Sequence, residues 1–401
     1  MKLKKFFAGV LAAAMMLTVG ATAAFAEGTA TDTVEPATTV TAIAGDKALE
    51  ASDNIPLYKN YFVKKGIAPA EEFEFTVTYV KTLQQDTAKF KPSYNENQTV
   101  LSGLKVSFAQ LGTSANAVSD SFNVTPAQLG LSNPTGTGKY LYKITETKGK
   151  TTATTYADPV YMIVTVAHKV DAATKKIDKD NYVYYVTMSR QEPAANSDKF
   201  ADNTKINNTE AFKNYYGKDA EDKDTVFNLV LSKEVAGNFG DLTKPFTFHV
   251  TFEADNNVTR GPIQVSALTN GADISLGNTS YSESDTLVYG TEYTVTLKDG
   301  QSINFGNLPA GVKYSITEVL STTDNYNVTV NGNAQAKNVA YEGTVSGNND
   351  AKTDTVAYVN TNPESPDMGV VLDNAPYIAM LAIVAIGGVA LMLNKRRRDE
   401  E

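Results

Sequence analysis

The sequence predicts an all-β protein in which two β-sandwich domains follow one another between two apolar chain ends. From residue 54 onward, apolar and polar residues alternate with a period of two, and Gly, Asn, Asp and Pro interrupt the pattern at short intervals. No long stretch with a helical period of 3.6 residues occurs away from the termini. The two halves also repeat the same motifs in the same order, and 401 residues are enough for two domains.

The N-terminus has the three parts of a secretory signal peptide. Lys2, Lys4 and Lys5 are basic, an apolar stretch follows, and Ala24-Phe25-Ala26 has the small-x-small pattern of a cleavage site. We therefore expect residues 1–26 to be removed on export. Residues 27–53 are rich in Thr and Ala and poor in large apolar residues, which predicts a flexible leader.

Residues 363–401 have the layout of a cell-wall sorting signal. A pentapeptide precedes an apolar run over 375–393, long enough for a transmembrane helix, and a basic cluster at Lys395–Arg398 follows that run. The alternative is a plain membrane anchor. The pentapeptide resembles the LPxTG class, with Ser in place of Leu and Met in place of Thr. The resemblance implies that a sortase recognises Ser365, Pro366, Asp367, Met368 and Gly369 and cuts after Met368.

Composition argues against several classes of function. The formal net charge of −9 is unfavourable for nucleic-acid binding. The chain has no cysteine and only two histidines, so neither disulfides nor a metal site nor a Ser-His-Asp triad is expected. No glycine-rich phosphate loop lies between a strand and a helix, and we predict no cofactor. The acidic stretch 253–257 is interpreted as a solvated turn in preference to a calcium site.

The internal repeat defines the domains. FEFTVTY at 73–79 matches FTFHVTF at 246–252, and YKITE at 142–146 matches YSITE at 314–318. A lysine precedes each first motif and an asparagine closes each half. We expect β-sandwich domains at 54–214 and 226–362, joined by a charged linker at 215–225. The first half has the longer interval between its glutamate and its asparagine, which predicts an extra hairpin near 158–190.

Six polar residues fall in register with the apolar face of their predicted strands, in the same order in both halves: Lys59, Glu146 and Asn208, then Lys233, Glu318 and Asn360. Burying an unpaired lysine or glutamate is costly, so six such positions suggest a chemical purpose. Burial favours a neutral amine and a protonated acid. That amine can attack the carboxamide, releasing ammonia and leaving a Lys–Asn amide, while the acid polarises the carbonyl and moves protons. Asn207 competes with Asn208, but the register favours Asn208.

The order Lys, FxFxVT, YxITE, Asn and sorting tail resembles the isopeptide-containing backbone pilins of Gram-positive bacteria, of the two-domain streptococcal T-antigen type. The resemblance covers nearly all of residues 54–401. It implies Ig-like, Cna-B-like sandwiches, with Lys59 bonded to Asn208 and assisted by Glu146, and Lys233 bonded to Asn360 and assisted by Glu318. Bond formation occurs once per site, so the protein is not expected to be an enzyme with turnover.

The resemblance also implies the partners and location. A sortase would join the chain to neighbouring pilin subunits and finally to peptidoglycan, on the surface of a Gram-positive cell. The acceptor lysine would lie shortly before the asparagine of the first domain, at Lys199 or Lys205. Minor pilins or a host ligand are further partners, and the membrane is contacted only transiently through the C-terminal span. A monomeric wall-anchored adhesin is the main alternative function, and a hydrolase on a sandwich scaffold has little support.

Overall fold

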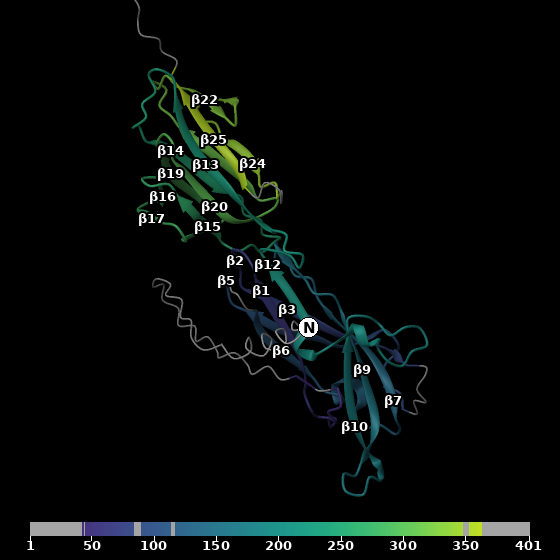
Figure 1. Ribbon diagram of the computed structural model, residues 1–401. Helices are drawn as coiled ribbons and strands as arrows, with labels where there is room; N and C mark the ends of the chain where they lie inside the picture. The colour runs from purple at the N-terminus through teal and green to yellow at the C-terminus, as the bar shows by residue number, and fades with distance from the viewer. Residues whose placement is uncertain (1–41, 44, 84–89, 114–116, 348–352, 363–401) are drawn as a thin grey trace, which may run out of the picture.

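The computed structural model describes residues 42–43, 45–83, 90–113, 117–347 and 353–362. Strands dominate these residues and build two domains, so the all-β prediction is confirmed (Figure 1). The predicted signal peptide, the pentapeptide at 365–369 and the apolar span at 375–393 all lie outside the described residues. Within the described ranges, none of the helices has both the length and the apolar character needed to cross a membrane.

Domain 1 is a sandwich of two sheets, described below by the order in which neighbouring strands are hydrogen-bonded. One sheet has the order β6-β1-β12-β8 and the other β11-β10-β9-β7-β3-β4, while β2 and β5 form a separate small ribbon. The bounds are β1 Ile55–Val63, β2 Ile67–Ala68, β3 Glu71–Thr82, β4 Gln98–Phe108, β5 Leu111–Gly112, β6 Val118–Val124, β7 Gly138–Glu146, β8 Thr154–Thr155, β9 Val160–Val170, β10 Ile177–Ser189, β11 Lys205–Ile206 and β12 Phe212–Tyr216. Short helical turns occur at η1 Ala127–Leu131, η2 Asp202–Thr204 and η3 Asn208–Glu210.

Domain 2 is also a two-sheet sandwich. Its sheets have the orders β18-β15-β20-β13-β25-β22-β23 and β17-β16-β19-β14-β21-β24. The bounds are β13 Val226–Ala236, β14 Phe246–Phe252, β15 Ile263–Leu268, β16 Asp273–Leu276, β17 Thr279–Tyr281, β18 Thr286–Leu287, β19 Glu292–Leu297, β20 Ser302–Pro309, β21 Lys313–Val319, β22 Asn327–Val330, β23 Asn333–Gln335, β24 Tyr341–Thr344 and β25 Thr353–Thr361.

The first and last long strands of each domain are parallel neighbours. In domain 1, β1 pairs with β12 and places Tyr61 opposite Asn214. In domain 2, β13 pairs with β25 and places Val235 opposite Asn360. Tyr61 and Val235 each lie two residues after a buried lysine. The two domains therefore bring the same pair of strand positions together in the same register.

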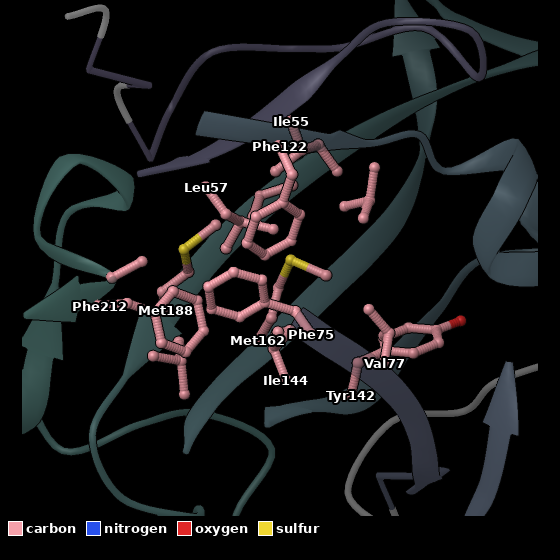
Figure 2. Close-up of a cluster of buried hydrophobic side chains, with 14 of the residues drawn as sticks. Ile55, Leu57, Phe75, Val77, Phe122, Tyr142, Ile144, Met162, Met188 and Phe212 are labelled. Atoms are coloured by element: carbon pink, nitrogen blue, oxygen red, sulfur yellow. The ribbon is translucent and has the colours of Figure 1, made fainter. Parts of the chain in front are cut away.

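Each domain has its own apolar core between its sheets. In domain 1, Phe75 from β3 stacks on Phe122 from β6 with ring centroids 4.4 Å apart, and its centroid lies 4.7 Å from that of Phe212 on β12. Figure 2 shows these three rings meeting between the sheets, with Met162 and Met188 beside them. Such aromatic contacts across a sandwich stabilise the packing of its two sheets.

The structure changes the expected domain limits. Leu49, placed in the leader by the sequence, is buried and exchanges two backbone hydrogen bonds with Tyr184, so the folded part begins before residue 54. At the other end of domain 1, β12 extends through Tyr216, inside the segment interpreted as linker. The extra hairpin predicted near 158–190 is present as β9 and β10.

Asn307 on β20 joins the two domains. Its side-chain amide donates to the carbonyl of Ile67 at 2.8 Å and to that of Pro262 at 2.7 Å, and its oxygen accepts from the Tyr216 hydroxyl at 3.1 Å. A second contact, a bridge between Thr151 and Thr259, adds backbone hydrogen bonds across the junction. The domains are thus joined by a buried asparagine and by a backbone bridge nearer the surface.

Two buried lysine, glutamate and asparagine sites

The site in domain 2 contains the three residues that the sequence predicts. Lys233 on β13 lies with its Nζ 3.5 Å from Oε1 of Glu318 on β21, and the Asn360 amide on β25 donates to the same oxygen at 2.8 Å. All three residues are at most 3 % exposed. Lys233 also donates to the carbonyl of Glu234 at 3.0 Å. The amine, the acid and the carboxamide therefore meet in the interior.

The site in domain 1 contains two of its predicted residues and one that the sequence analysis missed. Lys59 Nζ on β1 lies 2.8 Å from Glu146 Oε2 on β7, and both side chains are fully buried. The other carboxylate oxygen of Glu146 accepts a hydrogen bond from the amide of Asn214 on β12. Asn214 is 0 % exposed and occupies the place that Asn360 holds in domain 2.

The choice of Asn208 as partner of Lys59 is wrong. Asn208 begins η3, outside the strands, and its amide donates to the carbonyl of Pro56 while its oxygen accepts from the backbone N–H of Ile43. The side chain therefore fastens the N-terminal segment to the domain. Asn207, the competing choice, is exposed next to it. Neither asparagine lies on the strand that pairs with β1.

A sequence signal for Asn214 does exist. Ala211-Phe212-Lys213-Asn214 matches Ala357-Tyr358-Val359-Asn360 in having Ala, an aromatic residue, any residue and Asn. The alternation of Phe212, Asn214 and Tyr216 as buried residues is that of a core strand. The linker predicted at 215–225 begins directly after Asn214 and so cuts this strand short.

Burial shifts both ionisable groups toward their neutral forms. Desolvation lowers the pKa of Lys59 to about 8, against the opposing attraction of Glu146, and it lowers the pKa of Lys233 to about 8 against that of Glu318. Desolvation likewise raises the pKa of Glu146 and of Glu318, although the neighbouring lysine opposes the shift. The environment thus favours proton transfer from the amine to the acid.

The first phenylalanine of each FxFxVT motif covers its lysine. Lys59 Nζ lies 4.0 Å from the centroid of the Phe73 ring, and Lys233 Nζ lies 4.4 Å from that of Phe246. A ring face at this distance excludes water and restricts the amine to the direction of the acid. The repeated motif therefore has a role at the site as well as in the core.

Among the described residues, three polar atoms of these sites are buried without a hydrogen-bond partner: Asn214 Oδ1, Asn360 Oδ1 and Glu318 Oε2. Leaving such atoms unpaired is costly, and native interiors contain few of them. A half-turn of either carboxamide would exchange its oxygen and nitrogen, directing the carbonyl to the acid that could polarise it. The unpaired atoms are thus those that an amide-forming reaction would use.

Other predicted residues lie away from these sites. Lys199 and Lys205 are exposed, and Lys205 forms an ion pair with Asp202 at 2.7 Å. Lys205 also lines a cavity of about 220 Å³ together with Ile43, Met188 and Asn208. No group of His, Asp or Glu side chains suited to hold a metal ion occurs in the parts of the chain that the structure covers.

The fold and the two sites define a class of tandem β-sandwich proteins that bury a lysine beside an asparagine between their first and last strands. The comparisons with known proteins find relatives that are pilus proteins. The chain is 32 % identical over 172 residues to a pilin of Streptococcus pyogenes serotype M1, which covers 42 % of this chain and 48 % of that protein. It is 29 % identical over 145 residues to the pilus tip adhesin Cpa of Streptococcus pyogenes, covering 36 % of this chain and 18 % of the adhesin.

The matches cover parts of these proteins. The chain spans about half the length of the curated pilin and less of the adhesin. Residues 227–362 match a family model described as a domain of unknown function, DUF7601. Among solved structures, the major pilin from Streptococcus pyogenes is similar over 78 % of this chain and 100 % of its own, with 20 % identity and a TM-score of 0.49. The predicted similarity to streptococcal pilins is found by the sequence comparison.

Proposed function

We propose that the chain is a structural subunit of a surface pilus, stabilised by one intramolecular isopeptide bond in each domain. The observation that carries this proposal is the pair of buried sites, Lys59 with Glu146 and Asn214, and Lys233 with Glu318 and Asn360. An ordinary globular domain gains nothing from burying such a triad. Similarity to a streptococcal pilin over about half of that protein's length supports the same function.

The reaction in each domain balances without a cofactor. The neutral lysine amine attacks Cγ of the asparagine, forming an N–C bond, and the Cγ–Nδ2 bond breaks. The protonated glutamate polarises the carbonyl, receives the proton from the attacking nitrogen and delivers a proton to the leaving nitrogen, so that ammonia departs. The glutamate ends in its starting protonation state. The product amide is neutral, which removes the cost of a buried charge.

The position of the bonds suits a mechanical role. Each would connect the first long strand of a domain to its last, and these strands are already parallel neighbours. Pulling parallel strands in opposite directions along their length loads all their hydrogen bonds together, and a covalent link between them prevents sliding. The domains need no disulfides for this purpose, in agreement with the absence of cysteine.

The mass of the folded protein tests the bonds. Recombinant protein with residues 27–362, which includes every described strand, should be lighter than its sequence mass by two molecules of ammonia. Asn214→Ala should restore one of them, and a tryptic digest should then lack the peptide joined through Lys59. Asn208→Ala is the matched control, since it removes a buried asparagine only six residues away and should leave the loss of both ammonias intact. The full sequence mass in the unsubstituted protein would exclude both bonds.

We infer that polymerisation uses the C-terminal pentapeptide and Lys199 or Lys205. Cleavage after Met368 and attack by a lysine of the next subunit would give a covalent fibre that is finally attached to peptidoglycan. The cavity beside Lys205 supports that lysine as acceptor, because an incoming peptide needs a recess next to the amine. High-molecular-weight ladders in wall extracts, lost in Lys205→Arg and retained in Lys199→Arg, are expected. A single monomer-sized band from the unsubstituted protein would instead indicate a monomeric adhesin.

A further inference from the structure

A second buried carboxylate lies near the domain 1 site and has no part in the reaction described above. Glu71, the first residue of β3, is 8 % exposed. Its Oε1 accepts a hydrogen bond from the Tyr156 hydroxyl at 2.5 Å, and its Oε2 accepts from Tyr61 at 3.2 Å and from Thr154 at 3.5 Å. Accepting at both oxygens is the role of an ionised carboxylate. Glu71 is thus a buried negative charge held by hydroxyl groups.

Glu71 lies on the same interior layer as Lys59. On β1, Tyr61 follows Lys59 by two residues on the same face, and its hydroxyl donates to Glu71. On β3, Phe73 follows Glu71 by two residues on the same face, and its ring covers Lys59. The Tyr61 and Phe73 rings meet edge to face with centroids 5.2 Å apart. The attraction of Glu71 for the ammonium adds to the stronger attraction of Glu146 and opposes the lowering of the Lys59 pKa by burial.

Domain 2 has the opposite charge at the equivalent position. Lys244 precedes Phe246 by two residues, as Glu71 precedes Phe73. Its Nζ lies 5.5 Å from the Phe246 ring centroid and pairs with Asp324, and both partners are partly exposed. The positive charge of Lys244 contributes to holding the Glu318 pKa down, against the larger effect of burial. Val235 replaces Tyr61, so the hydroxyl cluster has no counterpart there.

We propose that the residue two positions before the covering phenylalanine sets the pH range in which each isopeptide bond forms, with Glu71 moving the domain 1 reaction to higher pH than the domain 2 reaction. This inference rests on the proposed bonds. In the reactive state the lysine and the glutamate together hold one dissociable proton beyond the neutral amine and the carboxylate. At low pH the pair binds a second proton, which leaves the amine as an ammonium, and at high pH the pair loses its proton, which leaves no acid; the reaction stops in both cases. A nearby negative charge favours protonation at both limits and moves the whole range upward.

The remaining charged groups around the two lysines do not alter this direction. Around Lys59 these are Glu146 on β7 and Asp120, which is opposite Lys59 on β6 and half-buried. Around Lys233 they are Glu318, Asp299 and Glu234. They are constant in the comparisons below, so a substitution at position 71 or 244 isolates the effect of that charge.

The test follows ammonia loss during refolding. Protein with residues 27–362 is collected in denaturant from inclusion bodies, where the unfolded chain has not reacted, and is refolded between pH 5 and 9. Digestion and mass spectrometry give the rate for each bond separately. Glu71→Gln, which keeps the size and a hydrogen-bond acceptor, should move the domain 1 profile to lower pH and leave the domain 2 profile in place. A shift of one pH unit would raise the rate about tenfold on the acidic side.

Two further variants separate charge from packing. Tyr156→Phe removes a hydrogen bond from the same cluster without removing the charge, so the domain 1 profile should stay in place. Lys244→Gln should move the domain 2 profile to higher pH, and because its side chain is partly exposed it tests the proposal even if Glu71→Gln does not fold. An unmoved profile in both charge variants, or slower reaction at every pH without a shift, would overturn the inference alone. Absence of ammonia loss in the unsubstituted protein would overturn the proposed function as well.

Discussion

Asn214→Ala is expected to destabilise domain 1 by far more than the loss of one side chain. The substitution removes the proposed bond between β1 and β12 but leaves Lys59 and Glu146 as a buried ion pair at 2.8 Å. Asn214 follows Lys59 by 155 residues. In the loop-closure model, a cross-link over a loop of this length stabilises the folded state by about 5 kcal/mol. For a domain of this size, that free energy corresponds to a fall in Tm of roughly 10–20 °C.

Two companion variants separate the bond from its surroundings. Lys59→Met also removes the bond, but it removes the buried ammonium too, so a fall similar to that of Asn214→Ala would assign the loss to the cross-link. Asn208→Ala deletes the hydrogen bonds to Ile43 and Pro56 and keeps the proposed bond. The expected cost of that change is about 1–3 kcal/mol. Its fall in Tm should be clearly smaller than that of Asn214→Ala.

Thermal unfolding can be followed by calorimetry and by the fluorescence of the 21 tyrosines, which no tryptophan obscures. The transition of domain 2 in the same molecules serves as an internal reference and should not move. The reasoning would be refuted if Asn214→Ala melted within 2–3 °C of the unsubstituted protein, since a shift that small corresponds to about 1 kcal/mol. Equal losses in Asn214→Ala and Asn208→Ala would likewise show that no covalent bond distinguishes the two asparagines.

Two other predictions concern charge and the domain junction. In Asn214→Ala the unreacted Lys59 has a pKa of about 8 in the folded state, below its unfolded value near 10.4. Between these two pH values the unfolded state binds more protons than the folded state, so the free energy of unfolding should rise with pH. Urea titrations should show a rise of up to about 2 kcal/mol from pH 8 to 9.5. Adding Lys59→Met should abolish that rise, and a flat profile in Asn214→Ala itself would contradict the burial of a titrating amine. Asn307→Ala removes three hydrogen bonds at the junction and should widen the interdomain distance distribution measured between spin labels on the two domains, with the melting of each domain changed by only a few degrees. An unchanged distribution would mean that the other contacts at the junction, among them the Thr151 and Thr259 bridge and the Lys65 hydrogen bond to Val226, are enough to fix the domains.

The lysines and glutamates of the sites could be predicted because each lies within one uninterrupted strand. Lys59 shares its face with Ile55, Leu57 and Tyr61, and all four are buried. Inside such a strand every second side chain points to the same face of the sheet, so apolar neighbours at positions two apart reliably predict that a polar residue in phase with them is buried. The repeat then identified the equivalent residues in the second domain.

Asn208 could not be excluded by the same method because its apparent strand is broken. Ile206 belongs to the two-residue strand β11 in the opposite sheet, the chain then turns through η3, and the alternation begins anew at Phe212. A phase counted across a turn carries no information about the next strand. Comparing the closing segments of the two halves, in addition to their phases, would have selected Asn214.

The contacts between the two domains could not be predicted from the sequence for a different reason. Asn307 lies in the segment NFGNLPAG, and its φ of 59° is in the left-handed region that asparagine tolerates. Its partner Ile67 is 240 residues away in sequence. No local pattern predicts a contact of that range.

The two bonds should differ in what they do under load, and the place of the acceptor lysine decides how. If force enters at Lys205 and leaves after Thr361, the chain between Lys205 and β12 carries it past most of domain 1, and the Lys59–Asn214 bond lies beside this path. In domain 2 the force must cross from β13 to β25, so the proposed Lys233–Asn360 bond would carry it directly. Single molecules held at residues 205 and 362 should therefore not lengthen by domain unfolding when both bonds are present. Asn360→Ala should release the 126 residues between Lys233 and Asn360, a contour of roughly 400 Å, whereas Asn214→Ala should release no comparable length. Equal extension in the two variants would contradict this force path, because the proposed Lys59–Asn214 bond would then also carry load when the chain is held at residue 205.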